Sequence, residues 1–119
     1  MSSDSAPFCL VAGFSMLPLL RSGDRVFMQP AERNEIAPGD IVVFSRGGKQ
    51  IVHRVIRTGE KIQTQGDGNP RPDDPLEPEA ELFLCSSFER DGVVTPLTRG
   101  DAGLAEFRRN QSACRQRER

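Results

Sequence analysis

The sequence has one histidine and three cysteines among its 119 residues, and this scarcity limits the chemistry that the chain can perform. Cys9, Cys85 and Cys114 are far apart and form no Cys-x-x-C pair, so the pattern of a zinc site is missing. Isolated cysteines in odd number are most simply explained by free thiols in a reducing compartment. The sequence therefore predicts no metal, no cofactor and a cytoplasmic location.

Long hydrophobic runs are missing as well. The longest apolar stretch, residues 8–14, is far shorter than the ~20 residues that a membrane-spanning helix needs. The first residues lack the positive charge of a secretory signal peptide, and a net charge of −1 gives no overall attraction to nucleic acid. We expect a soluble protein that neither spans a membrane nor binds nucleic acid, although peripheral association with a membrane stays compatible with the sequence.

Eleven glycines and nine prolines divide the rest of the chain into short segments. Many of these segments are β-branched or alternate between apolar and polar residues, which favours strands. The expected strands are residues 8–12, 24–29, 40–44, 50–57, 61–65, 81–88 and 93–97. They predict an all-β fold, a single small β-barrel-like domain of short, mostly antiparallel strands.

The segments between and beyond these strands complete the expected organisation. Residues 16–21 are expected to form a short helical turn, and the proline-rich residues 66–78 to form an ordered loop or a linker. The β domain is expected to cover residues 8–98 and to follow a flexible N-terminus at residues 1–7. Residues 99–119 are rich in arginine and poor in apolar side chains, which predicts a basic tail that is a frayed helix or disordered.

Ser15 and His53 are the candidates for nucleophilic chemistry. Ser15 follows Gly13 at a turn after a strand, where free backbone N–H groups, including its own, could hold an oxyanion. A serine is a weak nucleophile until a base takes its proton, and imidazole is the side chain best suited to that task at neutral pH. Each residue also has an ordinary interpretation, as a turn serine and as a packed strand histidine.

The loop of residues 66–78 contains three aspartates that could hold the imidazole in the correct tautomer, namely Asp67, Asp73 and Asp74. Acids in such a loop also serve as helix caps, in Asx turns or as solvated charges. Lys49 and Lys61 are weaker candidates for the base, because a solvated ammonium group keeps its proton at neutral pH.

Five blocks of sequence occur in an order and at a spacing that resemble the signal peptidase I superfamily. They are Gly-Phe-Ser-Met-Leu-Pro-Leu-Leu at 13–20, Gly-Asp at 23–24, Pro-Gly-Asp-Ile-Val-Val-Phe at 38–44, Ile-Val-His-Arg-Val-Ile at 51–56, and Gln-Gly-Asp-Gly-Asn at 65–69 followed by Asp73 and Asp74. A weaker match continues over residues 81–97. The resemblance implies a β domain similar to those of LexA and the signal peptidases, with serine peptidase activity.

The resemblance also assigns roles to the candidate residues. It makes Ser15 the nucleophile of a Ser-Met-x-Pro motif. His53 stands where many bacterial members and LexA-type repressors have lysine, and its surroundings resemble the endoplasmic-reticulum, archaeal and sporulation-type branch. The spacing of that branch makes Asp73 the third catalytic residue, with Asp74 as the near alternative. Asp67 is then a supporting residue that is structural or orients the site.

Two features differ from the family pattern. Gly13 replaces a residue with a side-chain donor, so the oxyanion is expected to rest on backbone N–H groups such as that of Ser15. The membrane enzymes of the family have a transmembrane anchor, which this sequence lacks. We therefore expect a soluble serine endopeptidase that binds a peptide or protein precursor as an extended strand and prefers small residues just before the cut. The oligomeric state stays open.

Two other functions compete with this prediction. A catalytically degenerate peptidase fold that only binds peptides is favoured by the donor missing at Gly13. A LexA-like regulator that cleaves itself is less favoured, because only 14 residues precede Ser15. The Ala12–Gly13 bond resembles the cut site of such a regulator but lies too close to Ser15 to reach it.

Overall fold

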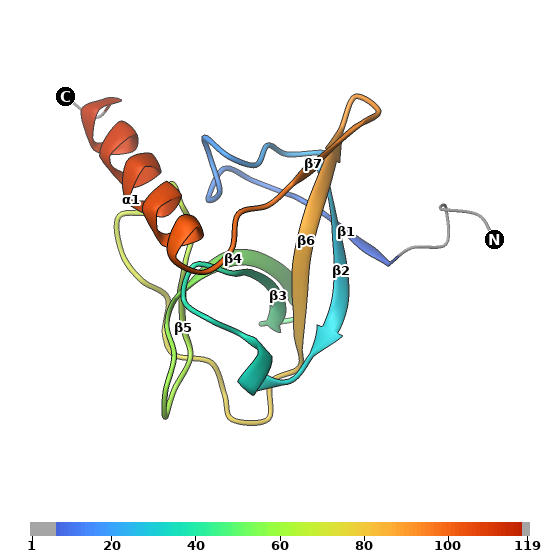
Figure 1. Cartoon of the computed structure of the whole chain (residues 1–119), viewed down its shortest axis with the longest axis vertical. Helices are drawn as coiled ribbons and strands as arrows, with labels where there is room; N and C mark the ends of the chain where they lie inside the picture. Colours follow the sequence, from blue (N-terminus) through green and yellow to red (C-terminus); the bar gives the residue numbers. More distant parts are fainter. Residues whose placement is uncertain (1–6, 118–119) are drawn as a thin grey trace.

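The computed structural model describes residues 7–117, which form seven β-strands and one α-helix (Figure 1). The strands are β1 (Phe8–Leu10), β2 (Arg25–Ala31), β3 (Ile41–Arg46), β4 (Lys49–Arg57), β5 (Gln63–Gln65), β6 (Leu82–Arg90) and β7 (Val93–Pro96). A short 3-10 helix, η2 (Arg33–Glu35), follows β2, and the helix α1 (Gly100–Arg117) follows β7. Each expected strand segment therefore contains a strand.

The strands pair antiparallel in the order β1-β2-β6-β3-β4-β5, and β7 pairs with β6. Strand β6 lies between β2 and β3, so it joins the part of the chain after the proline-rich loop to the part before it. The prediction of a small, all-β, mostly antiparallel domain is confirmed.

Apolar side chains form two clusters, one on each face of β3. Because successive side chains of a strand point to opposite faces, Ile41 and Val43 pack in the first cluster, whereas Val42 and Phe44 pack in the second. The buried members of the first cluster are Cys9, Val11, Met16, Leu20, Val26, Ile41, Val43, Val52, Cys85, Phe88 and Leu97. Those of the second are Ile36, Val42, Phe44, Val55, Ile62, Leu76, Leu82 and Leu84.

Residues 16–21 form hydrogen-bonded turns that include one helix-like bond of 2.9 Å from the Leu20 N–H to the Met16 carbonyl. This is the short helical turn that the sequence predicted, and it does not extend into a regular helix. Met16 and Leu20 are buried in the first cluster, which fixes this segment by packing against the sheet.

The segment after residue 99 differs from the prediction of a frayed or disordered tail. Residues 100–117 form one continuous helix, α1, which lies against the loops of the β domain (Figure 1). The helix backbone approaches this part of the protein closely at Gly103, where a Cβ atom would lie 2.2 Å from the Gly39 carbonyl oxygen. Glycine at this position therefore lets the helix backbone contact the loop before β3 directly.

The ends of the chain complete the description. Residues 1–6 of the expected flexible N-terminus, and residues 118–119, lie outside the described residues. Pro7 accepts a hydrogen bond of 3.1 Å from the Met28 N–H, which ties the described start of the chain to β2. Within residues 7–117, no helix has the length and apolar character needed to cross a membrane.

Candidate active site

Ser15 lies in the loop between β1 and β2, and backbone hydrogen bonds fix this loop at both ends. The Val11 N–H donates to the Asp24 carbonyl over 2.8 Å, and the Gly23 N–H donates to the Val11 carbonyl over 2.8 Å. At the centre, the Gly68 N–H donates to the carbonyl oxygen of Ser15 over 2.8 Å. The serine backbone is therefore held by the loop that follows β5, although the two segments are far apart in the sequence.

His53 lies in the middle of β4 and is buried. Its Nε2 atom is 3.0 Å from the Oγ atom of Ser15, and its Nδ1 atom is 2.5 Å from the Oδ2 atom of Asp73. An ionised Asp73 can only accept, so Nδ1 carries the proton of the neutral ring and Nε2 is left to accept the proton of the serine hydroxyl. The ring edge also packs against Phe44, with the ring centroids 6.3 Å apart.

Asp73 is held by the short strand β5. Its N–H donates to the Thr64 carbonyl over 2.8 Å, and the Thr64 hydroxyl donates to its Oδ2 atom over 2.7 Å. The Gln63 side chain donates to its carbonyl oxygen over 3.0 Å. Burial opposes the ionisation of Asp73, but the hydrogen bonds from His53 and Thr64 outweigh it and lower the pKa of this carboxyl group below its ordinary value. Asp73 therefore carries a negative charge at neutral pH.

The structure brings Asp73 to His53 and leaves the other two candidate acids away from it. Asp74 is exposed and lines a surface cavity together with Lys61. Asp67 is completely buried and pairs with the guanidinium group of Arg54, at 2.6 Å between Oδ2 and the nearest guanidinium nitrogen. The contacts therefore distinguish the aspartates that the sequence left as alternatives: Asp73 contacts the imidazole, and Asp67 pairs with Arg54 in the interior of the protein.

Within residues 7–117, Lys49 and Lys61 make no hydrogen bond to the serine hydroxyl, whereas His53 does. Lys49 is exposed at the start of β4, four positions before His53, and a strand rises ~3.3 Å per residue, which separates the two Cα atoms by ~13 Å. Lys61 is exposed in the turn before β5. Neither is placed to serve as the base.

Cys9 and Cys85 are also unsuited to nucleophilic chemistry. Burial raises the pKa of the Cys85 thiol to about 12, and burial raises the pKa of the Cys9 thiol as well. Because the thiolate is the reactive form, a thiol with a raised pKa is inert at neutral pH. Residues 7–117 hold no group of three or more His, Cys, Asp or Glu side chains that could bind a metal ion.

Backbone geometry near Ser15 leaves room for an oxyanion. Gly13 has a φ of 81°, and a Cβ atom there would meet no other atom within 4 Å. The N–H of Ser15 donates to no acceptor among residues 7–117. An amide that has no intramolecular partner and lies next to the attacking oxygen is the group that an oxyanion requires.

A cleft of about 480 Å³ opens at Ser15 and His53. Its lining residues are Leu10, Val11, Ala12, Gly13, Ser15, Met16, Lys49, Gln50, Ile51, Val52 and His53. On one side lie the residues that end β1, which pairs only with β2. On the other lies the first half of β4, because β5 pairs with β4 only from Arg54 onward. Two strand edges with free hydrogen-bonding groups therefore border the cleft.

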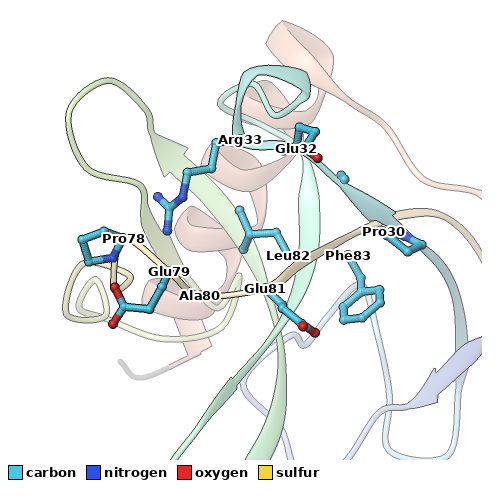
Figure 2. Close-up of a pocket in the computed structure, with 10 residues that line it drawn as sticks. Pro30, Glu32, Arg33, Pro78, Glu79, Ala80, Glu81, Leu82 and Phe83 are labelled. Atoms are coloured by element: carbon cyan, nitrogen blue, oxygen red, sulfur yellow. The ribbon is translucent and has the colours of Figure 1, made fainter.

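A second cavity, of about 490 Å³, lies where β2 ends and β6 begins (Figure 2). Its side chains include Arg33, Glu79, Glu81, Leu82 and Phe83, and it contains none of the serine, histidine and aspartate residues described above. The Arg33 side chain there donates to the carbonyl of Glu77. The lining of this cavity contains carboxylates but no serine, cysteine or histidine, so the paired serine and imidazole of the first cleft have no counterpart there.

The residues that surround Ser15, His53 and Asp73 were mostly not recognisable from the sequence. Thr64 was not recognised because a threonine in a short strand has no special spacing. Glu106, Asn110 and Cys114 of α1 recur every four residues, and this helical spacing was the one available signal that the tail presents a face to the domain.

An antiparallel β domain with serine, histidine and aspartate in one chain of hydrogen bonds beside a cleft has the arrangement of a serine hydrolase. The family model for Peptidase S24-like proteins matches residues 1–82. The chain belongs to this family, and the resemblance to the signal peptidase I superfamily is confirmed.

Curated relatives point in the same direction. The "Signal peptidase complex catalytic subunit SEC11C" of Homo sapiens is 34% identical over 92 residues, which cover 71% of this chain and 48% of the relative. The "Signal peptidase complex catalytic subunit SEC11" of Lachancea thermotolerans is 32% identical over 104 residues, which cover 79% and 61%. That of Arthroderma benhamiae is 33% identical over 108 residues, which cover 88% and 51%.

The chain thus spans about half to three-fifths of the length of these relatives. No solved structure matches the chain at a significant level. The family is therefore that of serine peptidases of the signal-peptidase type.

Proposed function

We propose that this protein is a serine endopeptidase of the signal-peptidase type that cleaves a peptide or protein precursor by a Ser-His-Asp mechanism. The observation that carries the proposal is the continuous chain of hydrogen bonds from Ser15 through His53 to Asp73, with 3.0 Å and 2.5 Å between the paired atoms. Both distances lie within hydrogen-bond reach, as general-base catalysis requires.

In the proposed acylation step, the Ser15 Oγ atom attacks the carbonyl carbon of the scissile peptide bond while its proton passes to Nε2 of His53. The negative charge that develops on the carbonyl oxygen is held by the backbone N–H of Ser15. Removing one such donor typically costs about 3 kcal/mol of transition-state stabilisation. The imidazolium then gives its proton to the leaving amine as the C–N bond breaks, and an acyl-serine remains.

Deacylation repeats these roles with water. His53 takes a proton from a water molecule whose oxygen attacks the acyl carbon, and it returns the proton to Oγ as the serine leaves. Asp73 stays ionised throughout and stabilises the imidazolium that forms in both steps. Its lowered pKa supports this role, because the carboxylate keeps its charge at neutral and mildly acidic pH.

The cleft supports an extended peptide as the substrate. Its two bordering strand edges can hydrogen-bond to a peptide backbone placed between them, which is the β-augmentation mode of recognition. The preference for small residues just before the cut is proposed from the family resemblance. The precursor is also proposed to be processed in the cytoplasm, and both points stay predictions until a substrate is identified.

The test is hydrolysis of a defined peptide pool, in which alanine or glycine precedes each of many different residues, followed by mass spectrometry of the products. The wild-type chain should produce cleavage after small residues, and the Ser15→Ala and His53→Ala variants should produce none. Asp74→Asn is the matched control, since it alters a neighbouring exposed carboxylate. Equal cleavage by wild type and Ser15→Ala would exclude the mechanism, and peptide binding without cleavage by the wild type would favour the degenerate binding module.

A further inference from the structure

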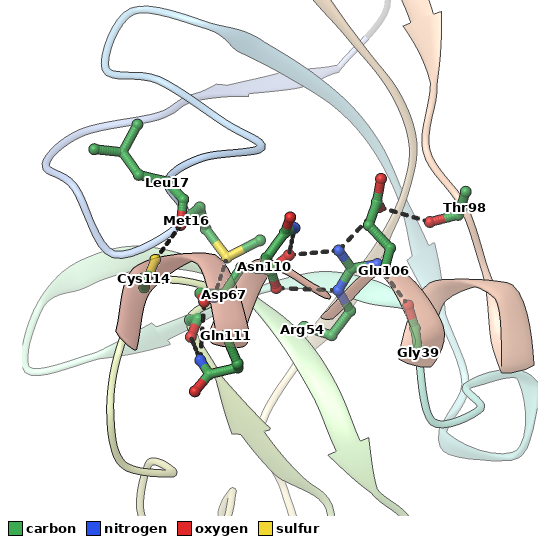
Figure 3. Close-up of polar contacts among 11 residues, drawn as sticks. Met16, Leu17, Gly39, Arg54, Asp67, Thr98, Glu106, Asn110, Gln111 and Cys114 are labelled. Carbon is green, nitrogen blue, oxygen red and sulfur yellow. Dashed lines mark hydrogen bonds and ion pairs between the residues drawn. The ribbon is translucent and has the colours of Figure 1, made fainter. Parts of the chain in front are cut away.

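The helix α1 directs a row of polar side chains at the loop that supports Ser15, as Figure 3 shows. Among them, the amide nitrogen of Gln111 reaches three carbonyl oxygens of residues 66–69. It lies 2.7 Å from the carbonyl of Asn69, 2.8 Å from that of Asp67 and 3.3 Å from that of Gly66. A single side chain thereby ties one face of this loop to the helix.

The same loop supports the nucleophile on its other face. The Gly68 N–H donates to the Ser15 carbonyl, and the Asp67 N–H lies 3.4 Å from the Met16 sulfur. A Cβ atom on Gly66 would lie 2.4 Å from the Ser15 carbonyl oxygen and 3.1 Å from Nε2 of His53. The loop is therefore in direct contact with both reacting residues, so a shift of the loop changes their relative position.

A buried ion pair connects the helix to the same loop at a second point. Arg54 and Asp67 are completely buried, and each also bonds to α1 (Figure 3). Glu106 lies 3.1 Å from the Arg54 guanidinium, and the Asn110 amide donates to Asp67 over 2.8 Å. Removing the helix would leave Arg54 and Asp67 paired with each other but would take one further hydrogen-bond partner from each, which favours the docked position of α1.

The end of α1 also reaches the segment just after the nucleophile. The Cys114 thiol donates to the Leu17 carbonyl over 3.7 Å. The helix therefore contacts two segments that adjoin Ser15, namely the loop of residues 66–69 and the turn that follows the serine. The family model ends at residue 82, so none of these helix residues belongs to the region that it matches.

From these contacts we infer that α1 acts as a clamp on the active site and that Gln111 is its positioning residue. This inference rests on the proposed Ser-His-Asp function. Gln111 touches neither the serine hydroxyl nor the imidazole. It fixes the loop of residues 66–69, and the loop fixes the backbone of Ser15 at hydrogen-bonding distance from His53. Displacement of reacting atoms by ~1 Å can lower a rate by ~100-fold, so a clamp of this kind acts on the rate of the chemical step.

The experiment measures how fast a fluorophosphonate probe labels Ser15 in the full chain, at several probe concentrations and pH values. Gln111→Met removes the donor and keeps the length of the side chain. It is expected to lower the maximal labelling rate by about 10- to 100-fold and to change the concentration for half-maximal labelling by less than about 3-fold. The midpoint of the pH–rate profile should stay that of the wild type, because His53 and Asp73 keep their contacts.

Gln111→Lys tests rescue, because an ammonium group supplies three donors for the three carbonyls. It should retain most of the wild-type labelling rate. Arg108→Met is the matched control on an exposed position of the same helix and should label at the wild-type rate. Ile36→Val loosens the second hydrophobic cluster at a residue that does not line the Ser15 cleft and tests whether a general loss of stability is enough to slow labelling.

The outcomes separate the clamp from the proposed function. Wild-type labelling that is absent or independent of Ser15 would overturn the proposed function itself. If the wild type is labelled normally and Gln111→Met is labelled at the same rate, the clamp alone is overturned. The clamp is also overturned if Ile36→Val and Gln111→Met lose the same fraction of the labelling rate. If Gln111→Met fails to fold, Gln111→Asn keeps the amide and shortens the reach by one methylene. It should then show an intermediate rate, and a wild-type rate there would also overturn the clamp.

Discussion

Asp67 and Asp73 lie six positions apart on one loop, yet they have opposite surroundings. Asp67 is completely buried against Arg54, a group that keeps its positive charge throughout the accessible pH range. Asp73 has a side chain that is 19% exposed and faces His53, whose charge changes when a proton is transferred. The difference shows how one loop supplies both a carboxylate that is paired with a permanent cation and a carboxylate that faces a titratable ring.

The largest effect is expected from neutralising the carboxylate next to His53. Asp73→Asn keeps the shape of the side chain but can no longer fix the tautomer or stabilise the imidazolium. Peptide cleavage should fall by about 10⁴-fold with little loss of folding. Hydrolysis rates measured beside thermal unfolding would check both parts. A rate within 10-fold of the wild type would contradict the role of Asp73.

The next effect is on stability rather than on rate. Asp67→Leu removes the carboxylate that pairs with the buried Arg54 guanidinium, so this charge keeps fewer hydrogen-bond acceptors. The free energy of unfolding should therefore fall by about 3–5 kcal/mol. Urea denaturation gives this quantity. The double variant Arg54→Met/Asp67→Leu removes both charges and should recover much of the loss. A double variant no more stable than Asp67→Leu would show that the ion pair is not the source of the effect.

The pH dependence of stability extends the comparison to other carboxylates paired with cations. Burial opposes the ionisation of Asp24 and Asp40, but hydrogen bonds from Arg90 and Arg99 outweigh it and lower the pKa of each carboxyl group. An acid whose pKa is lower in the folded state stabilises the fold above its unfolded pKa of about 3.9. That contribution is lost as the pH falls through the folded-state pKa.

The free energy of unfolding should therefore decrease as the pH falls below about 4. Asp40→Asn should already be less stable at neutral pH and should lose less than the wild type on acidification. Urea denaturation at a series of pH values measures both slopes. Parallel pH curves for the two proteins would contradict a folded-state pKa of Asp40 below its ordinary value.

The smallest effect is expected at Asp74, which is adjacent to Asp73 in sequence but exposed. Asp74→Asn should change the cleavage rate by less than 2-fold and the free energy of unfolding by less than about 0.5 kcal/mol. The same hydrolysis and urea measurements apply. A loss comparable to that of Asp73→Asn would mean that the two acids exchange roles.

Strand positions were predictable because they follow from local patterns. The apolar run of residues 41–44 has to be buried on both faces, and the two clusters on either side of β3 fulfil this. Ser15 and His53 were identified through the resemblance of their motifs. The choice between Asp73 and Asp74 was not fixed by local sequence, because it depends on how Thr64 and β5 orient the loop.

The sequence predicted only a frayed helix or a disordered tail where the structure has the continuous, docked helix α1, and the reason is physical. Its docking relies on polar contacts with Arg54, Asp67 and the carbonyls of residues 66–69, and on the close approach of Gly103 to Gly39. These partners lie more than 40 positions away in sequence. Because residues 99–119 have few apolar side chains, the sequence pattern predicted a loose tail.

The most direct test of the account is the site and rate of fluorophosphonate labelling, read by intact mass and peptide mapping. The account predicts one adduct, located on Ser15, that forms in the wild type and not in Ser15→Ala, and that forms far more slowly in His53→Ala. An adduct on another residue, or the same rate with and without His53, would contradict the activation of Ser15 by His53.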